Sequence, residues 1–227
     1  MSNGVDIPVM QSRQLSAGVS WKRATWFVQA EAYAKQVKGI LSSSQGFQNQ
    51  FEFVRTQGQY TVTGVEVLIN HQHARMTQWM RYSLSQNVYD FASFIPPDFP
   101  NNTDIRHAVS AGMNYRFSTV EVGLGANWYT GRPTTSLVAG NEVVGGVLQY
   151  AQPNGQRLPD YFRVDASLRW YCYTRAQVKA QVGLSCWNIL NRKNILNAYY
   201  VLENNTPRYV QLTGLTITPN IFLRVDF

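Results

Sequence analysis

The final segment of the chain, 215–227, alternates between apolar and mainly polar side chains without a break and ends on an aromatic residue. Its apolar positions are Leu215, Ile217, Pro219, Ile221, Leu223, Val225 and Phe227. Because successive side chains of a strand point to opposite faces, this pattern predicts a β-strand with one apolar face. The length suits a tilted strand that crosses a bilayer, which takes about 9–11 residues. A terminal aromatic on the apolar face is expected where such a strand stops at a membrane interface.

The same alternation returns along the rest of the chain, in about nine segments spaced as in successive hairpins. These segments are 14–21, 26–35, 64–70, 76–85, 105–117, 120–128, 162–170, 177–186 and 215–227. Very short turns alternate with long polar loops, which cover 41–58, 91–103, 132–158 and 195–212. Membrane barrels show this asymmetry, with short turns in the periplasm and long loops outside the cell. The sequence therefore predicts an all-β chain that forms an antiparallel transmembrane β-barrel segment.

The composition agrees with a barrel wall and excludes other classes. Only 15% of residues are charged, against about 25% in typical soluble domains, and no run of about 18 apolar residues predicts a membrane helix. The net charge of +7 comes from basic residues that stand singly, so we expect no nucleic-acid partner. The start of the chain lacks the basic and apolar runs of an export signal, so we expect a mature form or a fragment. Cys172 and Cys186 lie too far apart on neighbouring predicted strands for a disulfide, so free thiols are expected.

The number of predicted strands is odd, although bacterial single-chain barrels have an even number. The first and last strands would run in the same direction and could not pair antiparallel. The predicted lumen-facing positions also carry many charges, which suit a wide polar lumen better than a tight interior. They are Glu66, Arg116, Glu121, Arg163, Asp165 and Arg169, together with Glu31, Arg81, Lys179, Arg224 and Asp226. These features predict either a missed strand or a section of a larger barrel.

Five motifs in order resemble the C-terminal half of a TonB-dependent outer-membrane receptor. They are the Gly-x-Glu strand at 64–66, the strand end YTGRP at 129–133, the strand LPDYFRVD at 158–165, the asparagine-rich run at 187–194 and the last strand at 219–227. The style is similar to that of receptors of the Bacteroidetes. The resemblance implies a barrel of about 22 strands with an N-terminal plug. Residues 1–227 would then form a partial barrel, without the plug, the TonB box and the earlier strands.

The resemblance also implies a function, a location and a set of partners. We expect a receptor in the outer membrane of a Gram-negative bacterium that binds and imports a scarce nutrient. Its partners would be outer-membrane lipid, the remaining barrel and plug, TonB acting through that plug, and possible surface lipoproteins. The barrel-assembly machinery would read the terminal strand, through Leu223, Val225 and Phe227. No cofactor, metal or catalytic residue is expected.

Ligand binding is expected in the long loops, because loops on a rigid scaffold carry function. Their aromatic side chains could stack on a ligand or pack the loops on each other or on a lipoprotein; they are Phe47, Phe51, Phe94, Tyr150, Tyr199 and Tyr200. The aromatic residues near the outward strand ends fit interfacial girdles; they are Trp21, Trp26, Trp128, Tyr115, Phe117 and Trp170. His71 and His73 are expected in a solvated turn.

Three alternatives stay open at the level of the sequence. The chain could be a small self-contained barrel, which needs one extra strand such as 197–203. It could be a structural subunit of a larger outer-membrane assembly without transport. An outer-membrane enzyme that uses His107 is disfavoured, because no serine or acid stands at a matching height; a structural histidine at the interface is expected instead.

Overall fold

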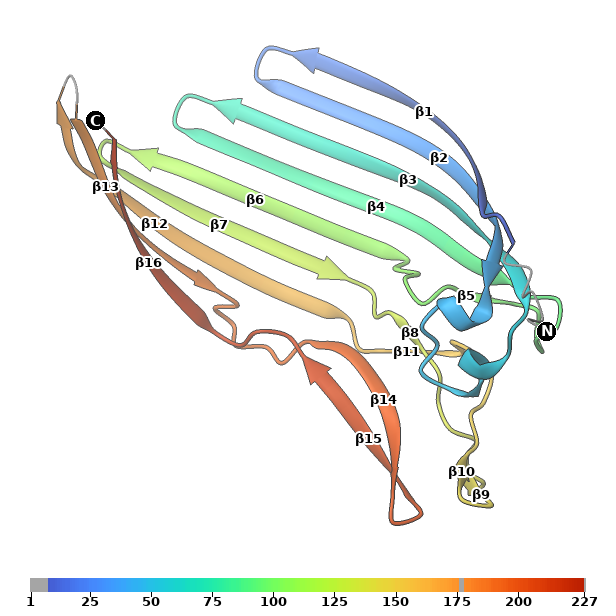
Figure 1. The fold of residues 1–227 in the computed structure, drawn as a ribbon. Coiled ribbons are helices and arrows are strands. Elements are labelled where there is room, and N and C mark those ends of the chain that lie inside the picture. Colours follow the sequence, from blue (N-terminus) through green and yellow to red (C-terminus); the bar gives the residue numbers. More distant parts are fainter. Residues whose placement is uncertain (1–7, 176–177, 227) are drawn as a thin grey trace, which may run out of the picture.

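The computed structural model describes residues 8–175 and 178–226, and within them one antiparallel sheet dominates (Figure 1). Its nine long strands are β1 (Gln11–Arg23), β2 (Trp26–Leu41), β3 (Gln57–His73), β4 (Met76–Asp90), β6 (His107–Phe117), β7 (Val120–Tyr129), β12 (Tyr161–Arg175), β13 (Val178–Trp187) and β16 (Thr218–Asp226). They pair in that order, and the short β5 (Asp98–Pro100) adds to β4 to make ten strands. This curved sheet, called the wall below, confirms the predicted strand number and the antiparallel fold.

The remaining elements gather at one end of the wall, where the long loops lie. They are η1 (Ser42–Ser44), η2 (Gln50–Phe53), β8 (Pro133–Thr134), β9 (Val143–Val144), β10 (Val147–Leu148), β11 (Gln156–Arg157), β14 (Ile195–Glu203) and β15 (Thr206–Thr213). At the other end the connections 24–25, 74–75 and 118–119 have two residues each. Long loops and short turns therefore occupy opposite ends, as predicted. No helix in the described ranges is long and apolar enough to span a membrane.

The β3–β4 turn is tighter than the sequence indicated. The β3–β4 turn was expected to run from 71 to 75, but β3 continues to His73 and β4 begins at Met76. Ala74 takes a positive φ of 46°, the conformation that two-residue hairpin turns demand. His71 and His73 are consequently strand residues rather than turn residues.

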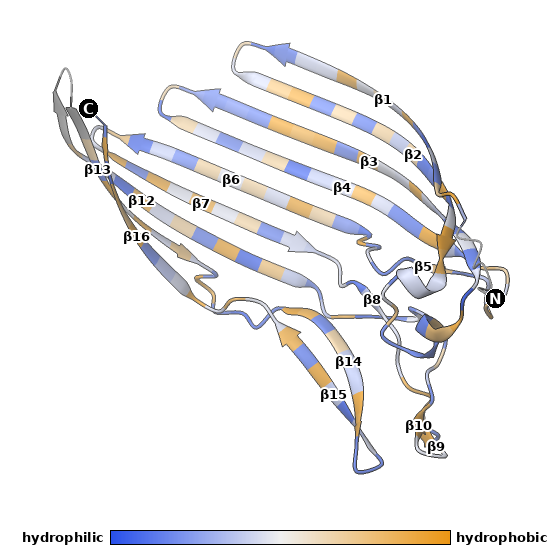
Figure 2. Ribbon diagram, viewed as in Figure 1, coloured by the Kyte–Doolittle hydropathy of each residue, from blue (hydrophilic) through white to orange (hydrophobic). Residues whose placement is uncertain are grey.

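Hydrophilic and hydrophobic residues alternate along the long strands (Figure 2), so the two faces of the wall differ in polarity. Apolar side chains of one face are strongly exposed, as with Leu15 at 76% and Ile221 at 77%. In water such a surface would be unfavourable, but it is what a barrel wall needs toward lipid. We call it the apolar face, and the opposite one the polar face. The buried hydrophobic cluster lies instead under the loops, at Val37, Ile40, Phe47, Tyr89, Phe91, Phe94 and Phe99.

Aromatic residues interrupt the polar face at positions where the neighbouring strand has a glycine. Tyr33 lies against Gly64, Trp79 against Gly112 and Phe222 against Gly183. A Cβ built on Gly183 would come within 2.0 Å of the Phe222 ring, so the glycine leaves the space that the ring fills. Such aromatic cover of strand glycines is a known device for fixing strand register. It explains why Trp79 and Phe222 break the alternation.

Among the described residues, β1 pairs only with β2 and β16 only with β13, so the wall is an open sheet. The extra strand that a self-contained barrel needs was sought at 197–203. That segment belongs to β14, which pairs with β15 in a separate hairpin outside the wall. In the described residues this segment therefore closes no barrel, because β14 finds its hydrogen-bond partner in a hairpin within its own loop.

Candidate functional site

The first two long loops form an aromatic core at the extracellular end of the wall. Phe47 is 1% exposed and packs edge-on against Tyr89, with ring centroids 5.5 Å apart. Phe94 is also buried, and half-buried Phe51 lies 5.0 Å from it. Aromatic pairs at these separations stabilise by both area and geometry. Phe47, Phe51 and Phe94 therefore pack the loops on each other, the second of the roles considered for them.

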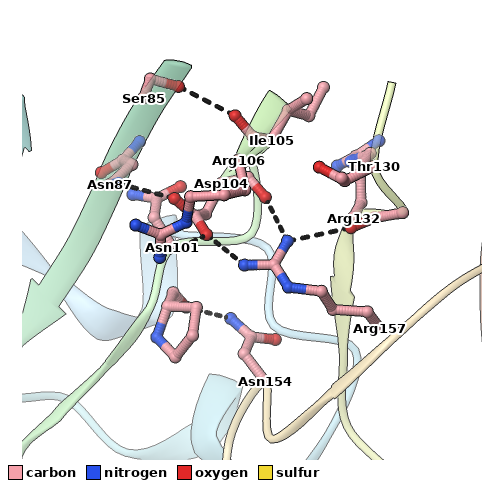
Figure 3. A network of polar contacts seen from close by, with 12 residues as sticks. Ser85, Asn87, Asn101, Asp104, Ile105, Arg106, Thr130, Arg132, Asn154 and Arg157 are labelled. Atoms are coloured by element: carbon pink, nitrogen blue, oxygen red, sulfur yellow. Dashed lines mark hydrogen bonds and ion pairs between the residues drawn. The ribbon is translucent and has the colours of Figure 1, made fainter. Parts of the chain in front are cut away.

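A buried carboxylate fastens the base of the third loop to the second (Figure 3). The Asp104 side chain is fully buried and forms ion pairs with Arg157 and, at 3.7 Å, with Arg106. It also accepts a hydrogen bond of 2.7 Å from the backbone N–H of Asn87. Arg157 Nη1 donates to the carbonyl oxygens of Asp104 at 2.8 Å and Gly131 at 2.9 Å. Because a buried charge requires partners, these contacts fix the loop bases, and we call them the Asp104 clamp.

Beside this clamp the loops enclose a polar cavity of about 90 Å³. Its lining comes from four loops and includes Phe47, Gln48, Asn49, Asn102, Arg132, Thr134, Thr135, Tyr150, Asn154, Asn197, Tyr199 and Tyr200. The structure thus brings Tyr150, Tyr199 and Tyr200 together, as side chains that line one cavity. The sequence reasoning missed the amides and Arg132; the strand-end motif at 129–133 contained the only signal for that arginine. Amides, hydroxyls and aromatic rings are the groups that orient small ligands.

Hydrogen bonds between loops hold the cavity in shape. Asn154 Nδ2 donates at 2.7 Å to both Pro100 O and Asn102 Oδ1. Thr135 Oγ1 accepts from Asn154 N at 3.0 Å and from Asn49 Nδ2 at 3.1 Å. These contacts connect residues far apart in the sequence, so the cavity exists only when all the loops meet.

Burial raises the pKa of the Tyr150 hydroxyl, and the nearby Tyr200 adds to that effect. The pKa of Tyr200 is likewise raised, first by burial and then by Tyr209. Both hydroxyls therefore stay neutral at physiological pH and can donate as well as accept hydrogen bonds. The role of the tyrosines in binding stays a prediction.

Several of the predicted lumen-facing residues lie on the polar face and form ion pairs there. Glu121 meets Arg116 at 3.0 Å and Arg169 at 3.7 Å, and it accepts a hydrogen bond of 3.2 Å from the Tyr171 hydroxyl. In the same manner Glu66 pairs with Arg81, and Arg163 with Asp165 at 3.0 Å. The pairs of Glu121 and Glu66 join neighbouring strands, whereas Arg163 and Asp165 both lie on β12. Cross-strand pairs of opposite charge stabilise a sheet modestly, and all these contacts leave the face polar, as a water-filled lumen requires.

The asparagine-rich run at 187–194 closes the extracellular ends of three strands. Asn188 is fully buried and donates from Nδ2 to Arg192 O at 2.9 Å and Leu215 O at 3.0 Å. Asn194 exchanges two hydrogen bonds of 2.9 Å with the backbone of Phe162. Asn191 Oδ1 accepts from Ile217 N at 3.2 Å. The motif is therefore structural, because its side chains satisfy backbone groups left over where β12, β13 and β16 end.

The neighbouring motifs share this structural role. Asp160 Oδ1 accepts a hydrogen bond of 3.1 Å from Gly131 N. A Cβ on Gly131 would lie 1.5 Å from Leu158 O, so only glycine permits this close approach of two loop bases. Tyr129 and Tyr161 stack with centroids 4.4 Å apart.

The histidines take structural positions on the apolar face. His71 stacks on Trp26 with ring centroids 4.1 Å apart, and His107 Nδ1 lies 2.9 Å from the Tyr82 hydroxyl. Within the described ranges no group of three His, Cys, Asp or Glu side chains could hold a metal ion. Cys172 and Cys186 are free thiols.

The predicted barrel-assembly residues lie on the terminal strand. Leu223 and Val225 are exposed on the apolar face of β16, at 69% and 40%. Phe227 lies outside the described residues. Recognition of this strand by the assembly machinery stays a prediction.

The sequence and fold of this chain are similar to those of known proteins. The family model described as TonB dependent receptor-like, beta-barrel matches residues 6–189. Among solved structures, the FrpB iron transporter from Neisseria meningitidis is similar over 98% of this chain and 32% of its own, with 16% identity and a TM-score of 0.63. The outer membrane transporter YddB from Escherichia coli is similar over 97% of this chain and 33% of its own, with 12% identity and a TM-score of 0.65.

A third similar structure is FpvA from P. aeruginosa, solved with iron and a heterologous pyoverdine. It covers 96% of this chain and 27% of its own, at 12% identity and a TM-score of 0.59. A search of curated proteins finds no match. The chain spans about a third or less of these structures. The family model matches most of the length of this chain. The chain therefore belongs to the TonB-dependent receptor-like β-barrel family and forms a wall section in the Gram-negative outer membrane.

Proposed function

We propose that this chain is the C-terminal barrel part of a TonB-dependent receptor that binds a scarce nutrient outside the cell and imports it. The proposal rests on one observation. Four loops, held together by the Asp104 clamp, meet at the extracellular end of the charge-lined wall and enclose a cavity lined by tyrosines and amides. A fastened cavity loses little conformational entropy on binding, which favours affinity. Tyr150, Tyr199 and Tyr200 are the proposed ligand contacts.

The transport role needs parts that this wall section does not supply. A plug domain and further strands complete the barrel in the proposed receptor, and TonB delivers energy through the plug. Two similar structures support a transport role by what their descriptions say of them: FrpB is an iron transporter and FpvA holds an iron–pyoverdine complex. The nutrients of these two proteins do not identify the nutrient of this chain, because function belongs to sites rather than folds.

Uptake by intact cells tests the proposal. Cells that express the complete receptor are given iron-loaded siderophores, cobalamin or oligosaccharides, each labelled, with and without a functional TonB. We expect one class to accumulate only with TonB. The double variant Tyr150→Ala/Tyr200→Ala should lower that uptake about tenfold, the loss expected for two aromatic contacts of a binding site.

Phe53→Ala is the matched control, because Phe53 is an aromatic of the same loop region that is 84% exposed and does not line the cavity. Its uptake should equal that of the unchanged receptor. If uptake of all three ligand classes is the same with and without functional TonB, the transport role is refuted.

A further inference from the structure

The apolar face carries a polar and aromatic ladder at its periplasmic end. Trp26 and His71 stack across β2 and β3 with centroids 4.1 Å apart and an interplanar angle of 25°. His71 Nδ1 then lies 3.0 Å from Gln78 Nε2 on β4. Imidazole and amide groups are costly toward hydrocarbon unless they have partners. Their place is consistent with the headgroup level of the inner leaflet, where amphipathic rings collect.

A groove of about 510 Å³ runs from this ladder across the apolar face. Its other lining residues include Ile69, Met80, Ala111, Met113, Leu124, Ala126 and Val164, from β3 to β12. Ala111 and Ala126 are directly paired in the sheet, so two small side chains lie side by side between larger ones. The depression is nearly all apolar, which suits a hydrocarbon chain.

Two arginines neighbour lining residues at the headgroup end of the groove, one through the sheet and one along the chain. Arg23 pairs in the sheet with Trp26, and Arg75 occupies the β3–β4 turn, three residues before Gln78. Both arginines are exposed, and neither forms an ion pair with any described residue.

No carboxylate of the described wall offsets these arginines on the apolar face. The acidic residues that the alternation places on the polar face are Glu31, Glu66, Glu121, Asp165 and Asp226. The remaining described acids lie at or beyond the extracellular ends of the strands. The periplasmic end of the apolar face therefore combines unpaired cations with a hydrocarbon-shaped groove.

We propose that this groove binds one anionic phospholipid of the periplasmic leaflet, with its phosphate at Arg23 and Arg75 and an acyl chain between Met80 and Leu124. The choice of occupant rests on charge complementarity and on lining chemistry. A guanidinium binds phosphate with short charge-assisted hydrogen bonds, and basic residues near a bilayer attract anionic lipid. Trp26 and His71 lie between the two parts, at the level of the glycerol esters.

Native mass spectrometry of the complete receptor tests this site. The receptor is purified in detergent, given equal amounts of dioleoylphosphatidylglycerol and dioleoylphosphatidylcholine, and examined for retained lipid. We expect one phosphatidylglycerol to be retained in preference. Arg23→Gln/Arg75→Gln should lower its affinity about tenfold or more, given the usual contribution of a basic residue near an anionic membrane. Ala126→Phe should lower retention without any change of charge, because the ring fills the groove.

Arg13→Gln/Lys38→Gln is the matched control, since both residues alternate onto the same face at its extracellular end and are exposed. Retention should be unchanged in this pair. Equal retention of the two lipids, equal loss in the control pair, or a co-purified protein in place of lipid would each overturn the proposal. The SDS-resistant, heat-modifiable form of each variant shows that the barrel is folded.

Discussion

Single polar residues decide how the loops of this receptor wall are anchored. Asn188 and Asp104 are both fully buried, and both form hydrogen bonds with backbone or arginine groups at strand ends. Removing such a residue leaves its partners unsatisfied and buried, which costs more than the hydrogen bond itself contributes. Asn188, from the family motif at 187–194, and Asp104, which lies outside the five motifs, therefore both act as loop anchors.

Asn188→Ala should lower the free energy of unfolding by about 2 kcal/mol, because a fully buried amide side chain is removed and two backbone carbonyl groups lose their donor. The midpoint of the heat-modifiable transition on gels reports this change. Asn204→Ala is the control: Asn204 also has a positive φ, 50° against 53° for Asn188, but it is exposed in the β14–β15 turn. Equal shifts for the two variants would show that backbone strain, and not the anchor, is responsible.

Asp104→Asn should loosen the base of the third loop, since the neutral amide no longer pairs with Arg157 and Arg106. We expect faster hydrogen exchange at the backbone amides of 132–158, by about tenfold for a loss of about 1.4 kcal/mol. Asp98→Asn is the control, because Asp98 is an exposed acid on β5 in the same loop. Unchanged exchange in Asp104→Asn would mean that the aromatic core alone fixes the cap.

At the scale of the strand, period-two alternation and its exceptions have one explanation. Alternation separates a face for lipid from a face for the lumen. The exceptions Tyr33, Trp79 and Phe222 are not errors in the pattern, because each ring covers a glycine on the next strand. Register is therefore fixed by shape on the polar face as well as by hydrophobicity on the other.

Gly183→Ala should lower the thermal stability of the wall, because the added methyl group meets the Phe222 ring and displaces it, at a cost of about 1–3 kcal/mol. Gly125→Ala is a matched substitution on the same face, where the new Cβ would have only the Ala111 carbonyl oxygen at 3.9 Å. It should be neutral or slightly stabilising. A Gly183→Ala barrel as stable as the Gly125→Ala barrel would contradict this packing account.

At the scale of the whole molecule, the unpaired edges of β1 and β16 limit the stability of the wall in a bilayer. Backbone groups at an unpaired edge have no partner in hydrocarbon, and each costs several kcal/mol there. In the described residues neither edge strand has a second neighbour. The wall therefore requires further strands before it is stable in a bilayer.

Expression of residues 1–227 alone should accordingly yield no SDS-resistant, heat-modifiable barrel in the outer membrane, whereas co-expression with the remaining wall and plug should restore one. Heated and unheated samples on the same gel provide the measurement. A heat-modifiable monomer formed by these 227 residues alone would contradict this prediction and support the alternative of a self-contained barrel.

By itself the sequence determined the strands, the orientation of their faces and the separation of turns from loops. These depend on local alternation, which each strand carries in its own residues. It also placed charges on the polar face and predicted free cysteines, far apart on neighbouring strands. The exact β3–β4 turn was not predicted, because His71 and His73 differ from turn residues only by their pairing across the sheet.

Only the tertiary structure decided how deeply each loop aromatic is buried. Phe47 and Tyr150 are both loop aromatics in the sequence, and their different burial depends on contacts with residues dozens of positions away. The same holds for the Asp104 clamp, for the β14–β15 hairpin and for the groove beside Arg23 and Arg75. Alternation is a property of one strand, whereas a cavity, a clamp or a groove is a property of several segments brought together, and no single segment encodes it.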